Sequence, residues 1–134
     1  MNAVSVAGIA VQGNRLFIAR RLPGGDLGEK WEFPGGKAEK GESCGEALIR
    51  EFREEFGVTV TVGPRIASAS FEHRGVVREL RACLVRFNDL NFVLNEHSAW
   101  KWADFAEIEK LDFAGSDRKL FPALKVYLER NPGI

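Results

Sequence analysis

The chain has 134 residues, of which 45% are hydrophobic and 28% are charged, a composition typical of a soluble globular protein. Its 19 basic and 19 acidic side chains give a formal net charge of zero. This balance excludes a globally basic surface of the kind that attracts nucleic acids or membranes. A phosphate-bearing ligand would therefore have to be bound by local groups or by a metal ion. The length fits a single domain over residues 1–134.

The cysteines and the N-terminal segment indicate a cytoplasmic protein. Cys44 and Cys83 form neither a C-x-x-C motif nor a zinc-like cluster, so we expect free thiols rather than a disulfide. Residues 1–10 are apolar but lack the basic start and the cleavage site of a signal peptide. No apolar run approaches the ~20 residues that a membrane span needs.

The first third of the chain reads as strands and a loop. Ala3–Val11 is rich in β-branched residues and predicts a strand, which Gly13-Asn14 turns back into a second strand over Arg15–Arg20. Residues 21–30 are polar and glycine-rich, which predicts a loop. Trp31–Phe33 then predicts a short strand.

A helix is predicted from Ser43 to about Phe56. Ser43 followed by Glu46 is a capping box, and Gly57 stands where a helix ends in a left-handed residue. The apolar residues fall on one side of the helical wheel, at Leu48, Ile49, Phe52 and Phe56.

The remaining chain predicts more strands and a second helix. The strands are expected at Val58–Val62, Ile66–His73, Val76–Phe87, Asn91–Leu94 and Trp100–Trp102, with a hairpin tip at Arg74-Gly75. An amphipathic helix is expected over Asp117–Arg130, where Pro122 fits only in the first turn. This order predicts an α/β or α+β fold, with a mixed sheet packed between helices.

Three carboxylates share one face of the first helix. Glu51, Glu54 and Glu55 are spaced i, i+3 and i+4, and like charges at that spacing cost about 0.2–0.5 kcal/mol per pair in an isolated helix. Arg50 and Arg53 offset part of this repulsion, and a divalent cation would do so more fully, because Mg²⁺ prefers oxygen ligands. These residues alone leave open a solvated helix face or a metal site.

The wider stretch Gly35–Val58, GGKAEKGESCGEALIREFREEFGV, resembles the signature of the Nudix hydrolase family. The identical positions are Gly36, Glu42, Arg50, Glu51, Glu54, Glu55 and Gly57, and the apolar positions are Phe52 and Val58. Phe52 is a mild departure, because an aliphatic residue is more usual there. The resemblance implies a loop–helix–loop packed on a mixed sheet between helices, in agreement with the elements above.

The same resemblance implies a set of metal ligands. In the family pattern, the residues at Glu51, Glu54 and Glu55 bind Mg²⁺, for which Mn²⁺ can substitute, together with the carbonyl of Gly35. Glu51 is then the candidate general base for the attacking water, and Arg50 would hold it in position. Glu42 and the Ser43–Glu46 segment are expected to be structural, at the start of the helix.

The segments WEFPGGKAEKGE, FIARR and NEHSAWKW are similar to the MutT and CTP pyrophosphohydrolase branch of the family. By that resemblance, Glu96, six residues before Trp102, completes the metal site. Arg21 would contact the substrate phosphates, since a guanidinium binds phosphate oxygens bidentately. Phe33 would line the base pocket or belong to the core. His97 is expected to be a surface group.

Asp117 is the candidate base-reading residue. MutT has an asparagine at the corresponding place. An aspartate there, as in this chain, instead resembles the branch that acts on cytidine nucleotides. An ionised carboxylate only accepts hydrogen bonds, and cytosine N4–H₂ and guanine N1 and N2 all donate them. The alternative is that Asp117 caps the final helix.

The resemblance implies a Mg²⁺-dependent enzyme that hydrolyses a nucleoside triphosphate to the monophosphate and pyrophosphate, with attack at the β-phosphorus. Its substrate would be an oxidised or modified nucleotide of the 8-oxo-dGTP type, or CTP or dCTP. The alternatives are a non-catalytic nucleotide-binding module and a hydrolase of RNA 5′ triphosphate ends. We expect a monomer or homodimer with a small-molecule nucleotide substrate, and no stable nucleic-acid or membrane partner.

Overall fold

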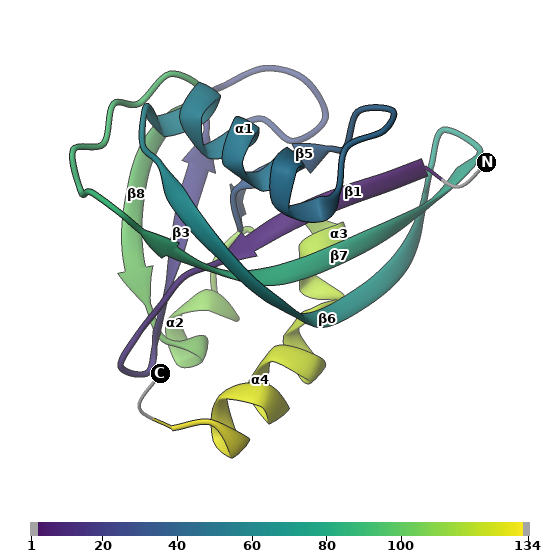
Figure 1. Cartoon of the computed structure of the whole chain (residues 1–134). Coiled ribbons are helices and arrows are strands. Elements are labelled where there is room, and N and C mark those ends of the chain that lie inside the picture. Colours follow the sequence, from purple (N-terminus) through teal and green to yellow (C-terminus); the bar gives the residue numbers. More distant parts are fainter. Residues whose placement is uncertain (1–2, 133–134) are drawn as a thin grey trace.

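The computed structural model describes residues 3–132, which form strands of two sheets with α1 (Cys44–Phe56) lying across one face of the first sheet (Figure 1). In chain order the elements are β1 (Ala3–Ile9), β2 (Val11–Gln12), β3 (Arg15–Arg21), β4 (Trp31–Glu32), β5 (Gly35–Lys37), α1 (Cys44–Phe56), β6 (Val60–His73), β7 (Val76–Phe87), β8 (His97–Ala103), α2 (Phe105–Ile108), α3 (Gly115–Arg118) and α4 (Phe121–Arg130).

The strands of the described region form two four-stranded sheets. The first has the order β5-β1-β7-β6, in which β1 and β7 run parallel while the other neighbours run antiparallel. In the second, β3 pairs with β2, β4 and β8, all antiparallel. The mixed sheet expected from the sequence is therefore confirmed.

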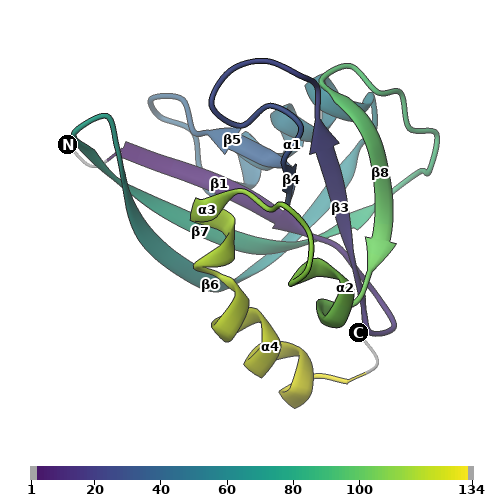
Figure 2. The same ribbon diagram turned by 180° about the vertical axis from the view of Figure 1, so that it is seen from behind.

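Helices cover both faces of the first sheet, with α1 on one side and α4 on the other (Figures 1 and 2). Successive residues of β1 alternate between the two sides, because side chains of a strand point to opposite faces. Val6 packs in the cluster that contains Phe52 and Phe56 of α1. Ala7 packs in the other cluster, which contains Leu124 of α4. The sheet thus carries two cores, and α1 is fixed against one of them.

Local signals at both ends define α1. The Ser43 hydroxyl accepts a hydrogen bond from the Glu46 backbone N–H at 3.1 Å, and the Glu46 carboxylate accepts one from the Ser43 N–H at 2.9 Å. Gly57 ends the helix in the left-handed conformation, with φ 67°. Close packing holds the helix on β1, since a side chain at Gly8 would lie 2.5 Å from the Phe52 ring. The predicted helix and its caps are confirmed.

The strand boundaries differ from the prediction in several places, and β5 at Gly35–Lys37 was not predicted. The first strand ends at Ile9, and Val11–Gln12 forms the separate β2. The two strands predicted between residues 58 and 73 are one strand, β6, which continues through irregular pairing between Val62 and Ala67. The final strand, β8, is longer than predicted and begins at His97.

The strand predicted at Asn91–Leu94 is wrong. The backbone N–H of Val93 donates to the carbonyl of Phe56 at 2.8 Å, and that of Asn95 donates to the carbonyl of Glu55 at 3.1 Å. These donors satisfy the free carbonyls at the end of α1 instead of pairing with a strand. The loop is thereby tied to the helix that carries the acidic residues.

The single helix predicted over Asp117–Arg130 is divided into α3 and α4. The break precedes Phe121, and Pro122 lies in the first turn of α4, where its missing N–H has no partner to lose. The shorter α3 begins at Gly115, two residues before the predicted start.

Two further observations concern the thiols and the membrane. Cys44 is half-buried, Cys83 is buried, and both are free thiols as expected. Within residues 3–132, no helix combines the length and the apolar character that crossing a membrane requires.

Candidate active site

The three carboxylates of α1 lie in three different environments. The side chain of Glu54 is 54% exposed, that of Glu51 is 14% exposed and that of Glu55 is 2% exposed. Glu51 faces β5, where a side chain at Gly36 would lie 2.8 Å from its carboxylate. Glycine at this position therefore leaves the space that Glu51 occupies.

Arg50 connects α1 to the loop that precedes it. Its guanidinium donates to both carboxylate oxygens of Glu42 at 2.8 and 2.9 Å, to Glu51 at 2.9 Å and to the Lys37 carbonyl at 3.0 Å. A longer bond of 3.3 Å reaches Glu54. The hydrogen bond from Arg50, together with the Glu39 backbone N–H, lowers the pKa of Glu42 to about 2. Arg50 is thus bonded to Glu51 on its own helix and to Glu42 in the preceding loop.

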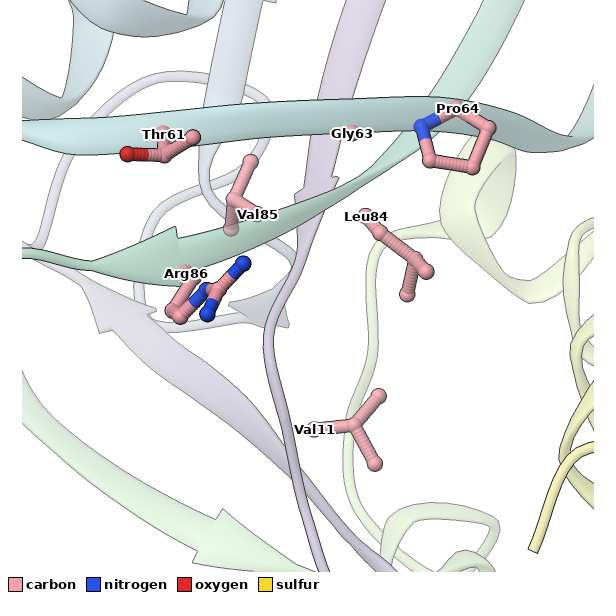
Figure 3. Close-up of a pocket in the computed structure, with 7 residues that line it drawn as sticks. All are labelled: Val11, Thr61, Gly63, Pro64, Leu84, Val85 and Arg86. Carbon is pink, nitrogen blue, oxygen red and sulfur yellow. The ribbon is translucent and has the colours of Figure 1, made fainter. Parts of the chain in front are cut away.

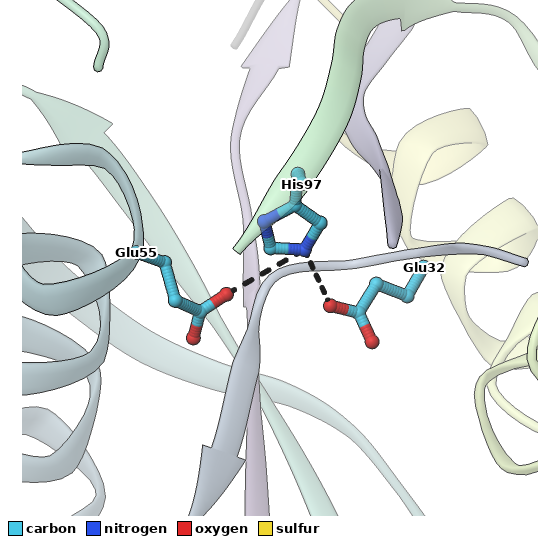
Figure 4. Close-up of side chains that lie close together, drawn as sticks. All are labelled: Glu32, Glu55 and His97. Atoms are coloured by element: carbon cyan, nitrogen blue, oxygen red, sulfur yellow. Dashed lines mark hydrogen bonds and ion pairs between the residues drawn. The ribbon is translucent and has the colours of Figure 1, made fainter. Parts of the chain in front are cut away.

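Glu55 belongs to a buried cluster with Glu32 of β4 and His97 of β8 (Figure 4). His97 Nε2 lies 2.8 Å from Glu32 Oε2 and 3.7 Å from Glu55 Oε1, so both acids approach the same ring nitrogen. The ring stacks on Phe56, with centroids 5.0 Å apart and planes 10° apart. His97 is therefore fully buried, and the expectation of a surface histidine is wrong because His97 pairs with Arg21 as the first residue of β8.

The environment of Glu55 suits a divalent cation. Burial, followed by its hydrogen bond with Glu51 and the nearby charges of Glu32, Glu51 and Glu96, raises the pKa of the Glu55 carboxyl far above its usual range. Its Oε1 is buried and has no hydrogen-bond partner among the described residues. A hard cation such as Mg²⁺ would supply the partner that this oxygen lacks and would favour its ionised form. The residues present therefore fit the cofactor expected from the sequence.

Glu96 and Gly35 are the other two residues that the sequence assigns to the metal. Glu96 is exposed just before β8, where its backbone carbonyl accepts a hydrogen bond from Leu22 at 3.3 Å. The charge of Glu96 is the weakest of the causes that raise the pKa of the Glu55 carboxyl. Gly35 pairs with Ala7 of β1, and a side chain there would lie 1.9 Å from the Val6 carbonyl oxygen.

A pocket of about 260 Å³ adjoins the carboxylates and contains the expected substrate-binding residues. Arg21, Phe33 and Asp117 all line it, together with Gly35 and Glu32. Glu32 connects the pocket to the cluster around Glu55, because the same carboxylate accepts from His97 and from Arg21 at 3.3 Å. The structure thus brings the predicted substrate residues and the predicted metal ligands to one region.

The NUDIX domain family model matches residues 1–124. The chain belongs to the Nudix family. It is 34% identical to the CTP pyrophosphohydrolase of Escherichia coli (strain K12) over 127 residues, which cover 95% of this chain and 94% of that protein. It is 43% identical to the 8-oxo-dGTP diphosphatase of the same bacterium over 56 residues, 42% of this chain and 43% of that protein. The solution structure of the E. coli ORF135 protein aligns with a TM-score of 0.86 and 33% identity, covering 100% of this chain and 96% of that chain.

Asp117 closes one side of the pocket in this Nudix hydrolase. The backbone N–H of Trp31 donates to the Asp112 carbonyl and that of Ala114 donates to the Trp31 carbonyl, each at 2.8 Å, which places α3 beside the end of β4. Asp117 Oδ2 then accepts from the Phe33 backbone N–H at 2.9 Å. The cap of α3 is Ala114, so the alternative interpretation of Asp117 as a helix cap is wrong.

Asp117 and Phe33 contribute different properties to the pocket wall. Burial, followed by the charge of Glu32, raises the pKa of Asp117 to about 7, so this carboxyl changes its protonation state near neutral pH. The ring of Phe33 packs edge-on against Phe113 and Phe121 while also lining the pocket. Phe33 therefore belongs both to the core and to the pocket, two locations that the sequence analysis had treated as alternatives.

The sequence missed several residues of this site. Glu32 and His97 were not assigned a role, although a glutamate between two aromatic residues in a short strand is an unusual place for a charge. Arg78 and Lys37 also line the pocket, and Arg78 is held by its hydrogen bond to the Ser5 hydroxyl at 3.2 Å. Arg78 lies on β7, which pairs in parallel with β1 far away in the sequence. The sequence alone does not indicate this pairing, so Arg78 could not be assigned to the pocket.

A second pocket, of about 400 Å³, lies between β6, β7 and β2 (Figure 3). Val11, Leu84 and Val85 contribute its apolar lining, and Arg86 is the one charged side chain among the described residues that line it. It shares no lining residue with the pocket that contains Asp117. This hollow has no group for acid–base or metal chemistry, so the carboxylate region is the candidate active site of the Nudix hydrolase.

Proposed function

We propose that this Nudix hydrolase uses Mg²⁺ to convert nucleoside triphosphates to nucleoside monophosphates and pyrophosphate. The observation that carries the proposal is Oε1 of Glu55, which is buried beside other carboxylates without a hydrogen-bond partner. A buried polar atom without a partner is costly and calls for an ion or a ligand. The two E. coli relatives, named for CTP and for 8-oxo-dGTP, support pyrophosphohydrolase activity on nucleotides.

The proposed cation ligands are the carboxylates of Glu51, Glu54, Glu55 and Glu96 with the carbonyl of Gly35. Carboxylate and carbonyl oxygens are the donors that Mg²⁺ prefers, and Mn²⁺ accepts the same set. When bound, the cation neutralises charge on the phosphate chain and polarises the phosphoryl oxygen. Glu51 and Glu55 stand one helical turn apart on α1, so their side chains leave the same face of the helix.

The remaining steps are assigned to side chains of the chain itself. Arg21 faces the pocket with a side chain that is 35% exposed, so its guanidinium can bind phosphate oxygens. Glu51 takes a proton from the attacking water, and Arg50 fixes the Glu51 carboxylate for that task at 2.9 Å. Attack at the β-phosphorus releases the nucleoside monophosphate and pyrophosphate.

Asp117 is proposed to select the base. Its carboxylate lies on the wall of the pocket beside Phe33, whose ring can contact the plane of a base. Ionised Asp117 accepts hydrogen bonds, and cytosine N4–H₂ or the N1–H and N2–H₂ groups of an oxidised guanine donate them. We therefore propose CTP, dCTP or an oxidised or modified nucleotide as the substrate.

The deciding experiment measures pyrophosphate release from CTP, dCTP, 5-methyl-dCTP, 8-oxo-dGTP and the common dNTPs, with and without Mg²⁺. We expect turnover only with the cation and a preference for a cytidine nucleotide or the oxidised base. Asp117→Asn should change the order of preference and leave the best remaining substrate hydrolysed, because the amide both donates and accepts.

Three results would contradict the proposal or a part of it. Faster turnover of a short RNA with a 5′ triphosphate than of any free nucleotide would assign the enzyme to RNA ends. Binding of nucleotides without release of pyrophosphate from any of them would indicate a non-catalytic nucleotide-binding module. Equal loss on all substrates in Asp117→Asn would remove the base-selecting role of that residue.

A further inference from the structure

Glu32 and His97 form a buried pair that touches the candidate metal site without belonging to its expected ligands. The His97 side chain is fully buried, that of Glu32 is 10% exposed, and they are 65 residues apart in the sequence. Glu32 also accepts from the guanidinium of Arg21 at 3.3 Å, which balances its negative charge. The stacking of His97 on Phe56 fixes the plane of the ring, and with it the direction of Nε2.

The surroundings of His97 determine which nitrogen of the neutral ring carries the proton. Nδ1 is buried and has no hydrogen-bond partner among the described residues. A proton on Nδ1 would bury an unpaired donor and would leave the lone pair of Nε2 facing Glu32 Oε2 at 2.8 Å. A proton on Nε2 removes both penalties, so His97 donates to Glu32 through Nε2.

A proton on Nε2 also separates His97 from the metal ligands, although Glu32, Glu55 and His97 offer atoms within 4.8 Å of one another. A histidine that binds a metal through Nε2 has its proton on Nδ1 and donates it to an acceptor in the surrounding protein. His97 Nδ1 has no such acceptor among residues 3–132. The pair is therefore better suited to support the metal site than to hold an ion itself.

Glu55 Oε1 is the metal-site atom that lies next to the Glu32–His97 pair. It lies 3.7 Å from His97 Nε2, beyond hydrogen-bonding distance but close enough that a small rotation would bring the two together. We propose that Glu32 is a positioning residue of the metal site: it accepts the Nε2–H of His97 and so leaves Glu55 Oε1 free for the divalent cation. This inference rests on the proposed role of Glu55 as a cation ligand.

The test is a titration of the full chain with Mn²⁺, in which electron paramagnetic resonance reports the free ion. Glu32→Gln removes the charge but keeps an oxygen that accepts from His97, so it measures the effect of charge alone. Glu32→Leu also removes the acceptor and releases the His97 donor toward Glu55. We expect Glu32→Leu to bind Mn²⁺ about tenfold more weakly than Glu32→Gln, since a hydrogen bond to a carboxylate would compete with the ion.

A double variant distinguishes competition by His97 from a structural defect. Adding His97→Leu to Glu32→Leu removes the competing donor, so the double variant should regain most of that tenfold loss. A purely structural role of the pair predicts the reverse, because two defects in one buried cluster would weaken binding further. Additive losses, or equal affinities of Glu32→Gln and Glu32→Leu, overturn the proposal.

The single variants His97→Leu and Glu55→Gln test the inference even where Glu32→Leu does not fold. His97→Leu alone should bind Mn²⁺ within about twofold of the wild type, whereas loss of a true ligand or its support costs about 10–100-fold. A tenfold loss in His97→Leu therefore overturns the inference even where Glu32→Leu does not fold. Glu55→Gln tests the metal site itself: unchanged Mn²⁺ affinity there contradicts the proposed function, while weakening there with no effect of Glu32→Leu contradicts only the role of Glu32.

Discussion

The three glutamates of α1 show how one residue type takes different tasks within a single helix. Glu54 reaches solvent and makes a hydrogen bond of 3.3 Å with Arg50. Glu51 is held between Arg50 and Gly36, and Glu55 lies in the interior beside His97. Because the Glu54 side chain is more than half exposed, its replacement should change metal binding without changing the stability of the fold.

Glu54→Gln is expected to reduce Mg²⁺-dependent pyrophosphate release at least tenfold, because the amide loses the charge that a cation prefers. The unfolding midpoint in urea should stay close to that of the wild type, since the side chain is more than half exposed. Glu46→Gln is the matched control on the same helix, because glutamine also serves the capping box. Activity above about a tenth of wild type in Glu54→Gln would contradict the proposed metal site.

At the scale of elements, the two glycines of β5 allow close approach to its neighbours. β5 pairs with β1 so tightly that Gly35 leaves no room for a side chain beside the Val6 carbonyl, and Gly36 leaves none beside Glu51. The loop, β1 and α1 therefore hold one another at fixed distances. That rigidity is what a carbonyl ligand at Gly35 would require.

Gly35→Ala is expected to force β5 away from β1, because the new methyl group would lie 1.9 Å from the Val6 carbonyl oxygen. We expect a loss of about 1–3 kcal/mol in the free energy of unfolding, measured in urea, and a large loss of Mg²⁺-dependent turnover. Gly115→Ala is the control, since no atom lies within 4 Å of the added group. Equal behaviour of the two variants would show that the approach at Gly35 has no functional consequence.

The elements that the sequence predicted well are those defined by neighbouring residues. The caps and apolar face of α1 are local, so its limits at Ser43 and Gly57 were predictable. The same holds for the Gly13-Asn14 turn, which the structure confirms. Local signals also carried the resemblance that identified the family, because the whole motif lies within one loop and one helix.

The errors came from contacts between distant segments. Residues 91–94 have the composition of a strand, but the backbone N–H groups of Val93 and Asn95 bond to the end of α1. His97 looked like a loop residue because its partner Glu32 is 65 positions away. The roles assigned to the site residues stay predictions, whereas their grouping around one pocket and one acidic cluster is a property of the fold.

At the scale of the whole molecule, the net charge is zero, but several acidic side chains are buried together at the candidate active site. Glu32, Glu55 and Asp117 are all buried, and the charge of Glu32 raises the pKa of both of the others. Of the cations that line the pocket, Arg21 is the one that pairs with Glu32. The protein therefore keeps unfavourable buried acids at its candidate active site, which should appear as a dependence of stability on pH.

The carboxyl of Asp117 has a pKa of about 7 in the folded protein, against an ordinary value of 3.8. Between these values the folded chain holds a proton that the unfolded chain has lost, so the free energy of unfolding falls as pH rises from about 4 to about 7. This carboxyl accounts for up to about 4 kcal/mol of that fall. Asp117→Asn removes the titration while keeping an oxygen for the Phe33 N–H. Urea unfolding at pH 5 and pH 7.5, with metal ions chelated, should show a smaller decrease in the variant than in the wild type. Equal decreases would mean that Asp117 is already ionised at pH 5, and its burial would then carry no cost.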